Sequence, residues 1–91
     1  MAGPIHVRVF ARREGLFSYG GHVEIQNGGK PFTLYPQGGS WREYVDDVVS
    51  RLEVAHRIYD IEGKRRVVEV VPTDVPLGKM MELRSAAERA F

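Results

Sequence analysis

Residues 40–52, SWREYVDDVVSRL, form the one stretch of this chain with a clear helical period. Its apolar side chains recur at i, i+3, i+4, i+7, i+8 and i+11, which places them in one stripe along an α-helix and fits no β-strand. The stripe consists of Trp41, Tyr44, Val45, Val48, Val49 and Leu52. Ser40 and Glu43 have the spacing of a capping box, in which each side chain accepts a hydrogen bond from the other's backbone N–H. The sequence therefore predicts an amphipathic helix that begins just after Ser40.

The remainder of the chain has the patterns of short strands and turns. A first strand with one buried face is predicted by the alternation of Ile5, Val7, Val9 and Ala11 with other residues. We expect further strands near residues 23–25, 32–35, 57–61, 67–71 and 79–84, and a helical turn or tail at 85–91. Leu16, Phe17 and Tyr19 are expected to pack within the connection between the first two strands.

This order of elements predicts an α+β domain. A single amphipathic helix must bury its stripe against another layer, and the strands supply a sheet for it. The order strand, strand, helix, strand, strand, strand on a chain of 91 residues is that of the ubiquitin-like β-grasp fold, with four to five strands around one main helix. We expect residues 1–91 to be a single domain of this kind, excised from a longer protein.

The sequence has little that suggests catalysis. It contains no cysteine, so it has no disulfide and no thiolate nucleophile. His6, His22 and His56 lack the spacing of metal ligands. The adjacent Asp46 and Asp47 point in different directions on a helix and cannot share a proton. We therefore predict a domain that is not an enzyme and has no catalytic residue, cofactor or metal.

The sequence also indicates where the protein acts. The start of the chain lacks the apolar run of a signal peptide, and no stretch is long enough to span a bilayer. The absence of cysteine is typical of a reducing compartment. We expect a cytoplasmic protein without a membrane partner.

Basic residues are concentrated outside the predicted helix. The net charge is +1, but residues 41–53 carry four acids and two bases, which leaves 11 bases and 8 acids elsewhere. The bases near predicted turns and on the first strand are Arg8, Arg12, Arg13, Arg57, Lys64, Arg65 and Arg66. Charged surface ordinarily serves solubility. A nucleic-acid surface would also need exposed aromatic side chains, and Phe17 and Tyr19 are expected in the core, so we predict no nucleic-acid partner.

Four stretches of the chain resemble a doublecortin domain, a ubiquitin-like module that binds microtubules. Residues 7–21 (VRVFARREGLFSYGG) are similar to the family's first strand, polar turn, aromatic residue and glycine. Residues 41–52 resemble its single helix, and residues 57–67 (RIYDIEGKRRV) resemble its aromatic strand, acid–glycine turn and following base. Residues 77–91 resemble its closing glycine, short strand and tail. Arg13-Glu14-Gly15, in place of the family's Asn-Gly-Asp, is typical of a divergent member, such as the doublecortin domain of an apicortin.

The resemblance implies a cytoskeletal function. Doublecortin domains dock on tubulin between protofilaments and stabilise the polymer. The seven basic residues given above are then the candidate tubulin contacts, because tubulin is acidic and exposed cations can dock on it reversibly. The resemblance implies a microtubule-associated domain. We expect the isolated domain to be monomeric.

An adaptor domain of the Ras-association type is the alternative. Such a ubiquitin-like domain binds a small GTPase in intracellular signalling by pairing sheet edges. It would use Arg8 and residues of the second strand, so composition does not separate the two functions.

Overall fold

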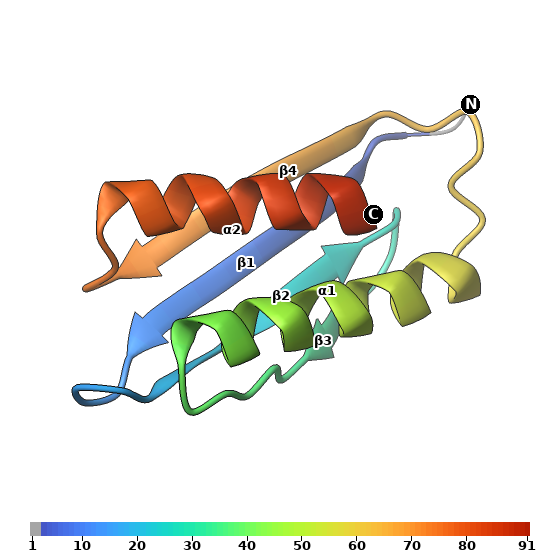
Figure 1. The fold of residues 1–91 in the computed structure, drawn as a ribbon. Coiled ribbons are helices and arrows are strands. Elements are labelled where there is room, and N and C mark those ends of the chain that lie inside the picture. Colours follow the sequence, from blue (N-terminus) through green and yellow to red (C-terminus); the bar gives the residue numbers. More distant parts are fainter. Residues whose placement is uncertain (1–2) are drawn as a thin grey trace.

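The computed structural model of this protein describes residues 3–91, with the backbone alone at residue 72. These residues form four strands and two helices (Figure 1). In chain order the elements are β1 (Ile5–Arg13), β2 (Tyr19–Gln26), β3 (Phe32–Leu34), α1 (Trp41–Ile58), β4 (Arg66–Thr73) and α2 (Leu77–Ala90). The predicted α+β class is therefore confirmed, and the four strands observed lie within the predicted four to five.

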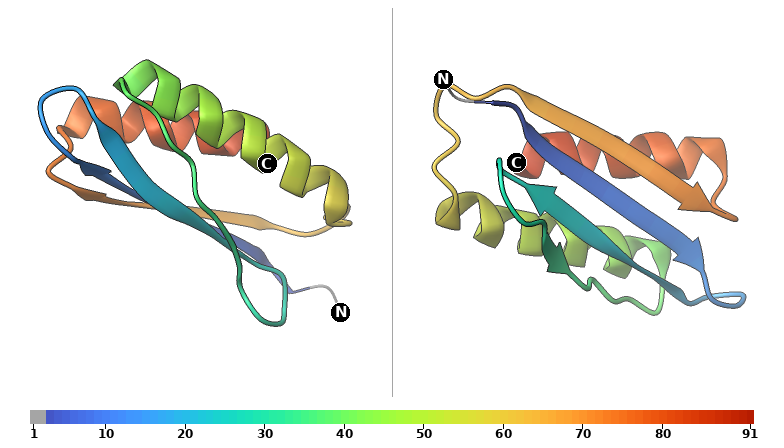
Figure 2. Two further views of the ribbon diagram at one scale, coloured as in Figure 1. Left: turned by 90° about the horizontal axis from the view of Figure 1, so that it is seen from below. Right: turned by 180° about the vertical axis from the view of Figure 1, so that it is seen from behind.

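The strands form one mixed sheet in the order β3-β2-β1-β4. β1 pairs antiparallel with β2 and parallel with β4, and β2 pairs antiparallel with β3. Because β4 runs parallel to β1, the chain must return along the sheet before β4 begins, and α1 makes this connection. Both helices lie on the same face of the sheet (Figure 2). None of the helices within residues 3–91 is long and apolar enough to cross a membrane.

Helix α1 begins where the sequence predicts. The backbone N–H of Glu43 donates to Ser40 Oγ over 3.2 Å, which makes Ser40 the N-cap. The Glu43 carboxylate accepts from the N–H of Gly39 over 3.1 Å, one residue before the predicted donor. The stripe faces the sheet and α2, and its buried members are Trp41, Tyr44, Val45, Val48 and Leu52.

The predicted strand at 57–61 is wrong, because α1 continues to Ile58. Ala55 extends the buried stripe by one turn and is 1% exposed. Arg57 Nε donates to the Glu53 carbonyl over 3.3 Å on the helix surface. The chain leaves the helix at Tyr59 and turns at Gly63, whose φ of 75° is a conformation that favours glycine.

The predictions of a strand at 79–84 and of a single helix are also wrong. Residues 77–90 form α2, which includes the predicted helical tail. The buried residues of α2 are Leu83, Ala86, Ala87 and Ala90, at the spacing i, i+3, i+4 and i+7. Three of these four are alanines, which carry a weak hydrophobic signal in a sequence but allow α2 to approach the sheet closely. Small size, rather than strong hydrophobicity, therefore defines this helix face.

The core lies between the sheet and the two helices. Ile5, Val7 and Val9 of β1 are fully buried, which confirms the predicted face of the first strand. Phe91 is 2% exposed and closes the core at the end of α2. Its ring lies 5.5 Å from that of His56 on α1, measured between ring centroids.

Trp41 joins three elements of the fold. It is 7% exposed, its ring packs edge-on against Tyr19 at 5.1 Å, and its Nε1 donates to Glu82 of α2 over 3.0 Å. We expect Trp41→Ala to lower the free energy of unfolding by about 3–5 kcal/mol. Ile58→Ala on the exposed end of the same helix is the control and should cost less than about 0.5 kcal/mol. Denaturant titration measures both, and a similar small loss for Trp41→Ala would show that the stripe faces no core.

Tyr44 predicts a loss of stability at alkaline pH. Burial raises its pKa to about 12, and the Asp47 carboxylate adds to the rise. The pKa of Tyr44 in the folded state lies above the unfolded value near 10. The contribution of the protonated Tyr44 to the free energy of unfolding is therefore complete below about pH 10 and is lost as the pH rises toward 12. We expect a loss of about 2–3 kcal/mol over this range in the native chain, measured by denaturant titration.

Tyr44→Phe is the control for this pH dependence. At neutral pH it removes the hydrogen bond that Tyr44 OH donates to the Phe10 carbonyl over 3.1 Å, at a cost of about 1 kcal/mol. Since phenylalanine does not ionise, the stability difference between the two proteins should shrink and reverse at high pH. An equal loss in both proteins would assign the alkaline unfolding to other groups.

Candidate functional site

The face of the sheet opposite the helices is open. Side chains alternate between the two faces along a strand, so Arg8, Phe10 and Arg12 of β1 lie on this face, opposite the buried residues of the same strand. The strand pairing places His22 and Glu24 of β2 beside them. No helix within the described part of the chain covers this surface (Figure 2).

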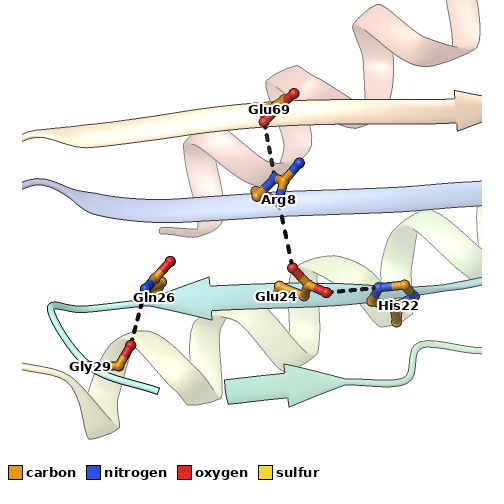
Figure 3. Close-up of polar contacts among 6 residues, drawn as sticks. All are labelled: Arg8, His22, Glu24, Gln26, Gly29 and Glu69. Carbon is orange, nitrogen blue, oxygen red and sulfur yellow. Dashed lines mark hydrogen bonds and ion pairs between the residues drawn. The ribbon is translucent and has the colours of Figure 1, made fainter. Parts of the chain in front are cut away.

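Arg8 lies at the centre of the open face between two carboxylates (Figure 3). The strand register sets Arg8 opposite Glu24 of β2 and Glu69 of β4. Arg8 Nε donates to Glu69 Oε2 over 3.0 Å, and Arg8 Nη1 lies 3.9 Å from Glu24 Oε2. Glu24 also lies 3.2 Å from His22 Nε2. The charge of Arg8 is therefore balanced within the domain, which reduces its attraction for an acidic partner.

Aromatic side chains extend this cluster toward β3. The rings of Phe10 and His22 stack with centroids 4.4 Å apart, and the Arg8 guanidinium lies 5.3 Å from the Phe10 centroid. Tyr35 lies beyond His22 at 6.4 Å. A hollow of about 350 Å³ adjoins these rings and is also lined by Arg12. Phe10 and His22 already pack on each other, so this cluster mainly orders the surface of the sheet.

The β1–β2 turn exposes two large apolar side chains. Leu16 is 75% exposed and Phe17 is 78% exposed, so the prediction that they pack within the connection is wrong. The Glu14 N–H donates to the Ser18 carbonyl over 2.7 Å and closes the turn, which places residues 15–17 outside the sheet. Tyr19, in contrast, is half-buried against Trp41. The packing prediction therefore agrees with the structure only at Tyr19.

Two arginines adjoin these apolar residues. Arg12 contacts the Glu14 carboxylate at 2.8 Å, and Arg13 Nε donates to the Gly15 carbonyl over 2.7 Å. We call Arg12, Arg13, Leu16 and Phe17 the turn tip. Two consecutive apolar residues that interrupt the period of two, directly after Gly15, are the sequence signal for this exposure.

The remaining predicted contacts lie toward the other end of β1. Arg57 lies near the end of α1, and residues 64–66 precede and begin β4. Lys64 Nζ donates to Asn27 Oδ1 over 2.6 Å, and Arg66 donates to the Glu88 carbonyl of α2 over 2.7 Å. Arg65 is exposed, and its side chain makes no hydrogen bond or ion pair within residues 3–91.

The seven predicted residues therefore do not form one surface. The domain is elongated, with principal extents of 45 × 21 × 21 Å. Arg12 and Arg13 lie where β1 ends, whereas residues 64–66 lie beside its start, because β4 is parallel to β1. Arg8 lies between the two groups. Within residues 3–91, Leu16 and Phe17 of the turn tip are the two most exposed large apolar side chains, and they lie beside Arg12 and Arg13.

No group of three or more histidine, cysteine, aspartate or glutamate side chains within the described residues is arranged to hold a metal ion. His22 contacts Glu24 on the sheet, whereas His56 packs against Phe91 on the helix side. Tyr44 is buried, and its hydroxyl is engaged by the Phe10 carbonyl. These residues have structural surroundings, and the turn tip is the better candidate for a functional site.

Comparison with known proteins gives no family for this chain. No model of a known protein family matches it, and a search of curated protein sequences finds no significant relative.

Gly21 lets β2 pass close to β1 beside the turn tip. Its φ is 142°, and a Cβ there would lie 1.8 Å from the Phe10 carbonyl oxygen. We expect Gly21→Ala to lower the free energy of unfolding by at least about 2 kcal/mol, because both the conformation and the space exclude a side chain. Gly29→Ala is the control, since a Cβ there meets no atom within 4 Å. Equal stability of the two variants in denaturant would contradict this close approach.

Proposed function

We propose that this domain is a non-catalytic docking module that binds an acidic protein surface through the turn tip, and that this surface is the microtubule. The exposure of Leu16 and Phe17 beside Arg12 and Arg13 carries the proposal. The doublecortin resemblance supplies the identity of the partner. The proposal also includes a β-grasp type of fold and a cytoplasmic, microtubule-associated location.

The turn tip has the composition of a binding hot spot. Protein interfaces concentrate their energy in a few apolar or aromatic anchors, with arginines enriched among them. Burial of Leu16 and Phe17 by a partner would contribute about 1.5–3 kcal/mol for each side chain. Arg13 donates only to the backbone carbonyls of Gly15 and Leu16, so its charge would add long-range attraction toward an acidic surface and accelerate association. The charge of Arg12 is partly balanced by Glu14 at 2.8 Å and adds less. The apolar pair therefore supplies affinity, and mainly Arg13 supplies steering.

The arrangement of the sheet supports the β-grasp part of the proposal. A β1–β2 hairpin, a parallel β1–β4 pair and a helix packed across one face are the features that the proposed fold requires. The second helix, α2, is a departure from the single-helix pattern. In this proposal α2 replaces the last strand of the sheet as a cover for the core.

The basic residues at the other end of β1 would make a secondary contact. Arg57 and Arg65 are exposed there, whereas Lys64 is engaged by Asn27. Two contact regions on an elongated domain can engage two neighbouring subunits of a polymer. Binding through both regions would exceed the affinity of either one alone.

Co-sedimentation with polymerised tubulin tests the proposal. We expect the native domain to pellet with microtubules, with an affinity that falls as salt rises, since screening acts within about 8–10 Å at ordinary ionic strength. The double variant Leu16→Ser, Phe17→Ser should reduce affinity at least about tenfold. Both side chains are exposed, so circular dichroism and thermal melting should show an unchanged fold.

A matched pair of charge reversals locates the contact. Arg12→Glu with Arg13→Glu should weaken pelleting and slow association. Lys30→Glu with Arg89→Glu makes the same change in net charge at exposed positions near the start of β1, away from the turn tip, and it should retain most binding. Equal effects of the two double variants would leave only non-specific charge attraction and would contradict docking through the tip.

The adaptor function remains the second candidate, and one observation favours it. β4 is a long edge strand, and edge strands are the elements that pair with a partner sheet. The adaptor alternative predicts that a partner binds residues of the second strand. This is less favourable, because β2 lies between β1 and β3 and is not an edge strand. Nucleotide-dependent capture of a small GTPase, without microtubule pelleting, would support the adaptor over the docking module.

A further inference from the structure

The outer edge of β4 carries backbone groups that the domain itself does not pair. The Ile5 N–H donates to the Arg65 carbonyl over 2.8 Å, and Ile5 lies opposite Arg66 in the parallel register. In a parallel pair the backbone groups of alternate residues point to opposite sides of the strand. Residues 67, 69, 71 and 73 therefore bond to β1, and the N–H and C=O groups of Arg66, Val68 and Val70 point outward. Proline 72 falls at the next outward position, where its lack of an N–H costs no bond to β1.

One flank of α2 borders this edge. The flank toward α1 carries Lys79 and Glu82, which contact Tyr19 and Trp41. The opposite flank carries Leu77, Met80, Met81, Arg84 and Glu88. Most of these side chains line a hollow of about 360 Å³ together with Val70 of β4. Leu77 is 68% exposed and Met81 is 61% exposed, so an apolar helix surface continues the unpaired strand edge.

We infer that two copies of this chain associate through β4 and α2 about a two-fold axis perpendicular to the sheet. In this dimer β4 pairs antiparallel with β4 of the second copy and extends the sheet across the axis. The same rotation keeps the helices of both copies on one face and brings the two α2 helices together. A two-fold interface must be self-complementary, and a strand edge and an apolar helix flank both satisfy this requirement.

The layer spacings of the fold agree with this arrangement. Adjacent strands lie about 4.8 Å apart, so β4 lies about 2.4 Å from the axis. α2 packs over β4 and, less closely, over β1, which places it about 5 Å from the axis. Two such helices are separated by about 10 Å, within the range at which helices pack side by side. Strand pairing and helix packing are therefore possible in the same dimer.

Charge on the α2 flank is compatible with the same axis. Arg84 and Glu88 form an exposed ion pair at 3.2 Å on the flank that the two helices would share. Antiparallel helices bring the base of one copy near the acid of the other. The flank thus presents one charge of each sign and no excess that would repel a second copy.

A second copy fits this surface better than a single peptide strand. An extended peptide would pair with the edge of β4 but would leave the exposed flank of α2 uncovered. A second copy supplies a strand and a helix at once, in the relative position that β4 and α2 already have. The inference replaces the monomer expected from the sequence, and it is independent of docking through the turn tip.

Sedimentation velocity and amide hydrogen exchange on the whole chain test the dimer. Between about 10 μM and about 1 mM, the range in which a weak dimer dissociates, we expect the mass to rise from 10.3 kDa toward twice that value. Over the same range the amides of Val68 and Val70 should become protected. The amides of Val67 and Glu69 bond to β1 in every copy and should remain protected at all concentrations, as an internal reference.

Met81→Glu places a charge on the shared flank and should raise the dimer dissociation constant at least about tenfold. Ile58→Glu is the matched control, since Ile58 is 68% exposed on α1 away from β4, and it should leave the dimer unchanged. A chain that stays monomeric throughout, or a dimer whose Val68 and Val70 amides stay unprotected, would overturn the inference. A dimer that is insensitive to Met81→Glu would overturn it as well.

Discussion

The hydrogen bonding of β1 on both of its edges is the constraint on which this structure depends. β1 pairs along its length with β2 on one side and with β4 on the other. One face of β1 is sealed by the helices, with Ile5, Val7 and Val9 fully buried. Because β4 is parallel to β1, its connection has to cover a face of the sheet, and α1 lies there. The positions of β2, β4 and α1 follow from this central strand.

Contacts between the two helices complete the sealed face. Glu82 of α2 accepts a hydrogen bond from Trp41, and Lys79 donates to the Tyr19 hydroxyl over 3.1 Å. The Lys79 ammonium also lies 5.2 Å from the Tyr19 ring centroid and 5.5 Å from that of Trp41. These contacts tie β2, α1 and α2 together at the end of the domain that carries the turn tip. The turn therefore projects from a well-supported base.

Placement of both helices on one face creates two surfaces with different chemistry. At the end of β1, the turn tip presents apolar side chains beside arginines, a combination that fits an acidic partner. Along β4, unpaired backbone groups and the apolar flank of α2 fit another strand and helix. The two surfaces share no residue, so a dimer through β4 leaves the turn tip of each copy accessible. Dimerisation would present two turn tips to a repetitive surface and raise the apparent affinity of the protein for that surface.

The elements with local sequence signals are predicted correctly. The 3.6-residue period and the capping residues predicted the start of α1, and the alternation of Ile5, Val7 and Val9 predicted β1 and its buried face. Local signals failed where packing determines the outcome. The small alanines of α2 form a buried face only because the sheet and α1 accommodate them, and nothing in residues 79–84 shows this in advance.

The candidate site was decided by the tertiary structure for the same reason. Sequence proximity predicted correctly that Arg12 and Arg13 lie together, but hydrophobicity alone assigned Leu16 and Phe17 to the core. Whether an apolar side chain is buried depends on whether another element reaches it, and the helices cover the sheet without covering this turn. Likewise, the parallel direction of β4 separates residues 64–66 from Arg12 and Arg13. Strand direction is fixed by long-range pairing, which no local stretch of sequence encodes.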